Sequence, residues 1–160
     1  MLEPDLTHLI SLHPDRGELP IACVKAVCFQ ESAFNEWAVR YEPSFKWLVG
    51  MPDTLTATER TCQMISWGLM QVMGAVAREH GFTNPLPKLC DPYTGLRYGM
   101  LHVRKFYDKY QNWPDTLSSY NAGSPRKNTE GKYLNQQYVD SVLRHWAKFE
   151  KQIPFKESEA

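Results

Sequence analysis

Apolar residues along this chain recur mostly at the spacing of α-helices. The clearest stripe follows Asp91, where apolar positions are separated by four, three, four and three residues at Leu96, Met100, Val103, Tyr107 and Tyr110. Comparable patterns predict further helices at about 20–32, 56–64, 66–80, 113–122 and 136–152. No convincing run of alternating apolar and polar residues predicts a strand, so we expect an all-α fold.

Capping signals mark the limits of several predicted helices. Pro20 suits the first turn of a helix, and Thr56 with Glu59 forms the pattern of a capping box. Gly81 and Gly123 are suited to end the helices that precede them. These signals support the limits that the apolar spacing predicts.

Two stretches lie outside the predicted helices, a polar loop at 124–132 and a long segment at 34–56. A loop of more than about 15 residues in a compact domain is usually functional or disordered. The long segment is rich in aromatic residues, namely Trp37, Tyr41, Phe45 and Trp47. Its aromatic content favours an ordered, functional loop.

Length and composition limit the class of protein. The chain has 160 residues and is predicted to form one domain over 1–160, with its core at about 20–150. Lys and Arg together number 18, as do Asp and Glu, so the chain lacks the positive charge of a general nucleic-acid binder. No apolar run approaches the roughly 20 residues that span a bilayer. Glu3 and Asp5 stand where a signal peptide would be positive, so we expect synthesis in the cytoplasm without one.

The cysteines and histidines form no metal-binding pattern. Cys23, Cys28, Cys62 and Cys90 include no C-x-x-C pair, and the five histidines are scattered along the chain. Cys23 and Cys28 are five residues apart on a predicted helix, so they point to different sides and cannot bridge each other. We expect buried, reduced thiols, and we predict neither a metal nor a cofactor.

Glu31 is the first residue that indicates chemistry. It falls within the apolar stripe of Ile21, Val24 and Cys28, at the end of the first predicted helix. A carboxyl group in that position loses hydration, which raises its pKa and suits it to donate a proton near neutral pH. The alternative is a structural carboxylate that pairs with an arginine or caps a neighbouring helix.

Two further segments combine polar side chains with glycine. In Ser66–Met73, Gly68 allows another backbone or a ligand to approach, and Gln71 is a hydrogen-bonding group among apolar neighbours. In Ser118–Gly123, Tyr120 and Asn121 lie at a predicted helix end where they can face a groove. The alternatives are methionines that fill the core, an ordinary helix C-cap and a core tyrosine.

The order of these segments resembles the soluble lytic transglycosylases, which belong to the glycoside hydrolase family shared with goose-type lysozymes. The matching segments are QESAFN at 30–35, GLMQVM at 68–73, SYNAG at 119–123 and Tyr138-Val139. The resemblance extends from about Pro20 to Trp146. It implies a lysozyme-like α-helical domain with a cleft for the glycan strands of peptidoglycan.

The resemblance also implies roles for individual residues. Glu31 matches the sole catalytic acid and base of the family, and Tyr138 matches the tyrosine that approaches the catalytic carboxylate. Met70 and Gln71 match residues that line the cleft and contact the sugar. The residues implied to support the site are Tyr120 and Asn121.

Two features depart from the family pattern. The GLMQ motif follows Glu31 by 37 residues, about twice the usual spacing, so residues 34–65 contain an insertion. The family commonly has a serine six residues before the glycine of that motif, thought to orient the acetamido group of the substrate. Cys62 occupies that position here, and Ser66 is a stand-in.

The activity that the resemblance implies is non-hydrolytic cleavage of the β-1,4 bond between N-acetylmuramic acid and N-acetylglucosamine, which leaves 1,6-anhydro ends. One alternative is a hydrolytic muramidase in which Glu36, Glu42 or Asp53 of the insertion activates water. Another is a non-catalytic peptidoglycan-binding component.

Without a signal peptide, a phage virion protein, a lysin released through a holin or a part of a secretion machine would fit. Virion or secretion-machine proteins are then the expected partners.

Overall fold

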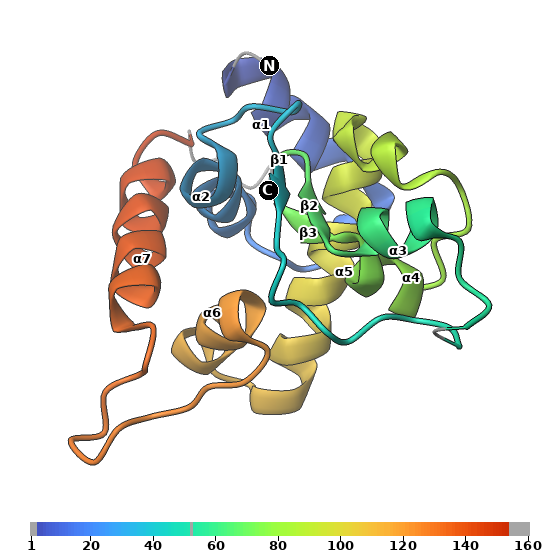
Figure 1. Cartoon of the computed structure of the whole chain (residues 1–160). Coiled ribbons are helices and arrows are strands. Elements are labelled where there is room, and N and C mark those ends of the chain that lie inside the picture. The colour runs from blue at the N-terminus through green and yellow to red at the C-terminus, as the bar shows by residue number, and fades with distance from the viewer. Residues whose placement is uncertain (1–2, 52, 154–160) are drawn as a thin grey trace.

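The computed structural model describes residues 3–51 and 53–153, and this part of the chain is mostly helical (Figure 1), which confirms the predicted fold class. The α-helices are α1 (Glu3–Leu12), α2 (Ile21–Ser32), α3 (Ala57–Gln63), α4 (Gly74–Glu79), α5 (Pro92–Tyr110), α6 (Trp113–Ala122) and α7 (Gln136–Glu150). The strands are β1 (Val39–Tyr41), β2 (Ile65–Trp67) and β3 (Val72–Met73). Short 3₁₀ helices at Pro14–Arg16 and Leu86–Cys90 complete the secondary structure.

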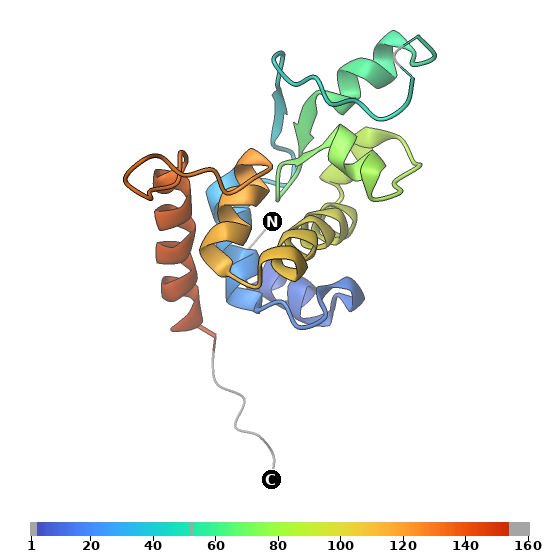
Figure 2. The same cartoon turned by 90° about the horizontal axis from the view of Figure 1, so that it is seen from below.

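The helices form one body and the strands lie at its edge. α2 packs along α7, and α5 packs against α6 (Figure 1). Figure 2 shows the strands and α3 together at one end of the molecule, with α1, α2, α5 and α6 at the other. Residues 34–65, where the sequence predicts an insertion, include β1, α3 and the first residue of β2.

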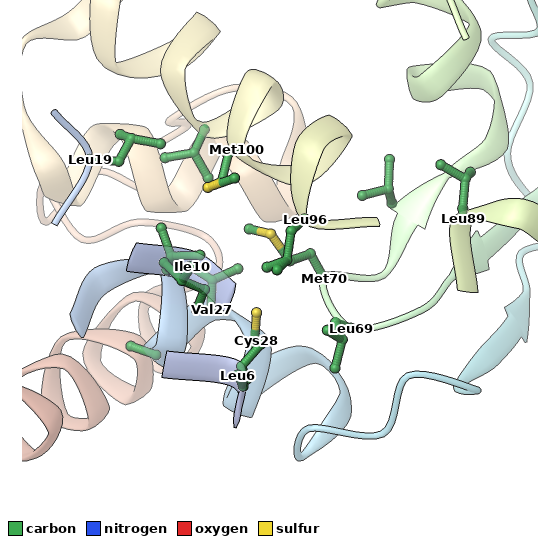
Figure 3. Close-up of a cluster of buried hydrophobic side chains, with 14 of the residues drawn as sticks. Leu6, Ile10, Leu19, Val27, Cys28, Leu69, Met70, Leu89, Leu96 and Met100 are labelled. Atoms are coloured by element: carbon green, nitrogen blue, oxygen red, sulfur yellow. The ribbon is translucent and has the colours of Figure 1, made fainter. Parts of the chain in front are cut away.

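The hydrophobic core joins the N-terminal helices to α5 and to the segment that follows β2. Figure 3 shows its side chains converging from these elements. The labelled core residues, all at most 5% exposed, are Leu6, Ile10, Leu19, Val27, Cys28, Leu69, Met70, Leu89, Leu96 and Met100. Leu6 and Ile10 belong to α1, which the sequence analysis did not predict, so the hydrophobic core includes side chains from before residue 20.

Side-chain caps place the helix starts close to where the sequence predicted them. Thr56 accepts a hydrogen bond from the Glu59 amide at the start of α3, and Asp91 accepts one from the Thr94 amide at the start of α5. Asn112 caps α6 in the same way. Each cap satisfies a backbone donor that the first turn of a helix leaves without a partner.

The helix predicted from near Ser66 to His80 is wrong over its first half. Residues 65–67 and 72–73 instead form β2 and β3, and the helix begins only at Gly74. Gly68 and Gln71 have positive φ angles of 69° and 47°, which no right-handed helix can contain. The sheet, in the order β1-β2-β3, is antiparallel and pairs Val39 with Trp67 and Trp67 with Val72.

Two further predictions concern the cysteines and helices that could span a membrane. There, Cys23, Cys28 and Cys90 are buried free thiols, and Cys62 is a half-buried one. None of the helices described has the length and hydrophobicity that a membrane span requires. The predicted domain limits of 1–160 include residues outside the described ranges.

Candidate active site

Glu31 lies in the last turn of α2, at the point where the helix ends. The helix stops because Ala33 adopts a left-handed conformation, with φ of 50°, and its amide donates to the Phe29 carbonyl. The Glu31 side chain is half-buried. Its Oε1 atom accepts a hydrogen bond of 2.6 Å from the hydroxyl of Tyr138, which comes from α7. The contact between α2 and α7 thus brings together two residues that are 107 positions apart.

The surroundings of Glu31 change its acidity. Burial raises the pKa of Glu31 from 4.5 to about 7, against the opposing effects of the Tyr138 hydrogen bond and of the positive charge on Arg40. The proton therefore leaves this carboxyl group near neutral pH. Because Oε1 accepts from Tyr138, the proton of the acid form belongs on Oε2.

The raised pKa predicts a pH-dependent stability that Glu31→Gln removes. Between pH 4.5 and 7 the folded protein holds a proton that the unfolded chain has released, so the free energy of unfolding falls as pH rises through this range. The full loss, up to about 3 kcal/mol, is reached above pH 7. Urea unfolding should show that Glu31→Gln gains stability relative to wild type at pH 8 and little at pH 4.5. An equal difference at both pH values would contradict the raised pKa, since the other titrating groups are common to both proteins.

The GLMQ segment forms a tight turn between β2 and β3. Gly68 donates its amide to the Ala38 carbonyl at 2.8 Å, and Gln71 donates its amide to the Gly68 carbonyl at 3.2 Å. The side-chain nitrogen of Gln71 also donates to the carbonyls of Ala38 and Gly68, at 2.9 and 3.0 Å. Gln71 is half-buried, and its amide nitrogen fixes the turn against Ala38, the residue before β1. Within the described residues its Oε1 has no hydrogen-bond partner, which leaves an acceptor for a ligand.

The structure places the side chains of Met70 and Ser66 in the interior, and the contacts with a sugar that the resemblance implies for them stay predictions. Met70 is 0% exposed, and its sulfur packs so closely on Gly99 that a Cβ at Gly99 would lie 2.3 Å from it. Ser66 is buried and donates its hydroxyl to the sulfur of Met73 at 3.2 Å. Met70 is held because the turn packs onto α5, and Ser66 is held because β2 pairs with β3. Both side chains pack on the interior side of the segment from β2 to β3.

Tyr120 connects α6 to this turn. Its hydroxyl donates to the Met70 carbonyl at 2.7 Å, and its ring lies against His102, with centroids 5.3 Å apart. Burial raises the pKa of Tyr120 well above its usual value, and the negative charge of Glu31 adds to this rise. The Tyr120 hydroxyl therefore fixes the GLMQ turn, whose Leu69 carbonyl contacts Ser32, the residue after Glu31.

Asn121, unlike Tyr120, has an exposed side chain. Its Oδ1 accepts from Asn135 Nδ2 at 2.9 Å, and Asn135 also exchanges hydrogen bonds with Ser118. Asn121 thus fixes the start of α7 against the end of α6. This contact helps to position the helix that carries Tyr138.

Ser32 is a contributor that the sequence analysis missed. Its hydroxyl contacts the Leu69 carbonyl at 2.8 Å and the Cys28 carbonyl at 3.1 Å. The first contact joins the end of α2 to the GLMQ turn, directly after Glu31 in sequence. Its place in the QES motif was the available signal, but the partner 37 residues away could not be read from spacing.

The insertion contributes exposed aromatic rings and charged groups. Trp37, Tyr41 and Trp47 are 71%, 53% and 73% exposed. Glu42, one of the carboxylates considered as a second catalytic group, forms an ion pair with Arg40. Among the described residues, no group of three or more His, Cys, Asp and Glu side chains is arranged to hold a metal ion. The candidate site consists of Glu31 with Tyr138 and the GLMQ turn around it.

Comparison with known proteins is consistent with this arrangement. A family model described as the transglycosylase SLT domain matches residues 9–140, a range that includes Glu31, the GLMQ turn, Tyr120 and Tyr138. No curated protein and no solved structure matches the chain. The match covers more than half of the sequence, and the chain therefore belongs to the transglycosylase SLT domain family, whose members act on peptidoglycan.

Proposed function

We propose that this protein is a lytic transglycosylase that cleaves the β-1,4 bond between N-acetylmuramic acid and N-acetylglucosamine. The observation that carries the proposal is the Glu31 carboxyl group, which has a pKa of about 7 and is hydrogen-bonded on one oxygen by Tyr138. A group with a pKa near the working pH can both give and take a proton. Membership of a family that acts on peptidoglycan supports the choice of substrate.

In the first step Glu31 donates the proton on Oε2 to the glycosidic oxygen. The bond between this oxygen and C1 of the muramoyl residue breaks, and its electron pair leaves with the N-acetylglucosamine hydroxyl. The 2-acetamido group of the muramoyl residue stabilises the positive charge at C1. In the second step the Glu31 carboxylate takes the proton of the C6 hydroxyl, whose oxygen bonds to C1. A 1,6-anhydro ring closes, no water is consumed, and Glu31 regains its proton.

Tyr138 fits both steps. Its hydroxyl donates to Oε1 and so fixes the direction in which Oε2 presents its proton. The same hydrogen bond stabilises the ionised carboxylate, which opposes part of the rise in pKa that burial causes. Glu31 is therefore acidic enough to donate its proton and basic enough to recover one from the C6 hydroxyl.

A hydrolase would need a second group to activate water. The insertion offers Glu36, Glu42 and Asp53, and Glu42 is already paired with Arg40. We expect Glu36→Gln, Glu42→Gln and Asp53→Asn each to keep activity on purified sacculi within about 10-fold of wild type, because Glu31 carries both proton transfers. A reducing-sugar assay beside the release of soluble glycan checks this prediction. New reducing ends in step with solubilised glycan, together with a loss of 100-fold or more (about the usual minimum for a general base) in one variant, would identify a muramidase.

A further inference from the structure

The insertion carries most of the exposed apolar side chains in the described part of the protein. Of the eight large hydrophobic side chains that are exposed there, five lie between residues 37 and 51. The most exposed of these five are Trp47 and Met51, each at 73%. Both belong to residues 45–51, named the 45–51 loop below, which Figure 1 shows at the periphery of the molecule between β1 and α3. Exposed apolar side chains that gather in one segment indicate a binding surface.

The 45–51 loop is held in this exposed position by a buried side chain of α3. Gln63 is 1% exposed, and its side chain accepts from the Val49 amide at 2.7 Å and donates to the Val49 carbonyl at 3.0 Å. The same amide nitrogen donates to Glu59, which forms an ion pair with Arg78 of α4. The middle of the loop is therefore fixed to two helices, while the side chains on both sides of Val49 stay at the surface.

Several backbone polar groups of the loop find their partners within the protein. Besides the two groups of Val49, the Leu48 amide donates to the Lys46 carbonyl at 3.1 Å. The Met51 carbonyl accepts from the amide and from the hydroxyl of Thr54, at 3.0 and 2.9 Å. A backbone group that is already hydrogen-bonded costs less free energy to move from water into a less polar medium. The loop can therefore enter such a medium without unfolding.

The side chains of the loop suit a lipid surface better than a sugar. Residues 45–51 include no Asp or Glu, and Lys46 is exposed without an ion-pair partner among the described residues. Tryptophan and lysine are suited to a membrane–water interface, where the indole ring lies among the headgroups and the ammonium group reaches their phosphates. A sugar site needs several placed hydrogen-bonding groups, whereas the side chains here offer only the Lys46 ammonium and the Trp47 indole N–H. The remaining side chains are purely apolar.

We propose that the 45–51 loop docks on an anionic lipid surface, with Trp47 and Met51 in the interface and Lys46 beside the lipid phosphates. Because few side chains take part, the binding is weak and reversible, as it is for a single lipid anchor. The proposal does not depend on the reaction proposed for Glu31. It gives a protein that acts on peptidoglycan a means of staying next to a membrane.

Sedimentation with lipid vesicles tests the proposal. The protein is mixed with vesicles of equal parts phosphatidylglycerol and phosphatidylcholine and, separately, with vesicles of phosphatidylcholine alone. Trp47→Ala and Lys46→Gln are compared with Trp37→Ala. Trp37 is 71% exposed and lies before β1, outside the loop, so it controls for the loss of one exposed indole ring. Unfolding curves verify that the variants stay folded.

The wild-type protein should bind the mixed vesicles more tightly than phosphatidylcholine alone. Trp47→Ala should weaken binding to the mixed vesicles by about 10–100-fold, the effect of burying one large apolar side chain. Lys46→Gln should weaken it by about 5-fold, and only on the anionic vesicles, the effect of one lysine near such a surface. Trp37→Ala should bind as wild type does. A wild-type protein that binds neither vesicle, or an equal loss in Trp37→Ala and Trp47→Ala, would overturn the proposal.

Purified sacculi, which hold no lipid, distinguish a lipid surface from a glycan as the partner of the loop. In a Glu31→Gln background, which avoids turnover, adding Trp47→Ala should leave binding to sacculi unchanged. A loss on sacculi as large as the loss on vesicles would assign the loop to glycan and overturn the proposal. Cleavage of sacculi by the wild-type protein reports separately on the proposed function, so the two failures can be told apart.

Discussion

Glu31→Gln should lower the rate of glycan cleavage by about 10²–10⁴-fold, the usual contribution of a positioned general acid and base. Glutamine has the size and shape of glutamic acid, and its oxygen can still accept the hydrogen bond from Tyr138. It cannot donate an acidic proton to the glycosidic oxygen or take one from the C6 hydroxyl. The rate at which purified sacculi become clear, followed by turbidity, measures the loss.

Glu42→Gln is the matched control for this experiment, because it makes the same chemical change at a carboxylate that is paired with Arg40. It should retain activity within about 10-fold of wild type, as expected for a group outside the proton transfers. Both variants must show cooperative unfolding before their rates are compared. A folded Glu31→Gln protein that clears sacculi at the wild-type rate would refute the role of Glu31.

Gly68→Ala should destabilise the protein by about 2–5 kcal/mol. Gly68 has φ of 69°, and an alanine in this left-handed region costs about 1–2 kcal/mol. A Cβ at Gly68 would also lie 2.4 Å from the Leu89 carbonyl oxygen, and relief of such a clash adds about 1–3 kcal/mol. The clashing atom belongs to the backbone of the 3₁₀ helix at Leu86–Cys90, which cannot rotate away as a side chain could. Urea unfolding measures the change.

Gly81→Ala separates the two causes. Gly81 has φ of 82°, and a Cβ there would meet nothing within 4 Å. This variant should therefore lose only about 1–2 kcal/mol, the cost of the left-handed conformation. Equal losses in the two variants would contradict the close approach between the GLMQ turn and the 3₁₀ helix.

The helices could be predicted well where local signals coincide. The limits of α5 and α6 follow from capping side chains, prolines and terminal residues that act within one turn of the chain. The sheet could not be predicted, since its strands have only two or three residues and show no alternation. Apolar residues from Leu69 to Val76 fit a helical spacing, but the left-handed angles at Gly68 and Gln71 depend on contacts with Ala38. Such contacts between distant residues leave no local pattern.

The candidate site likewise has features that a local pattern predicts and contacts between distant residues that no local pattern predicts. The position of Glu31 in an apolar stripe predicted a raised pKa from the sequence alone. The partnership of Glu31 with Tyr138 came only from the family resemblance, because no spacing rule links residues 107 positions apart. The family motif also suggested that Met70 contacts the sugar, whereas its side chain fills the core and its carbonyl accepts from Tyr120. The motif therefore singled out this segment, but it showed neither that the segment forms a turn nor which of its atoms reach the surface.

Mass spectrometry of the muropeptides that the wild-type protein releases from purified sacculi tests the central claim most directly. If Glu31 acts first as acid and then as base toward the C6 hydroxyl, the new muramoyl ends are 1,6-anhydro rings, lighter by one water than hydrolysed ends. Their amount should rise in step with the glycan released. Products that end in reducing N-acetylmuramic acid, with no anhydro ends beyond those already in the sacculi, would contradict the account.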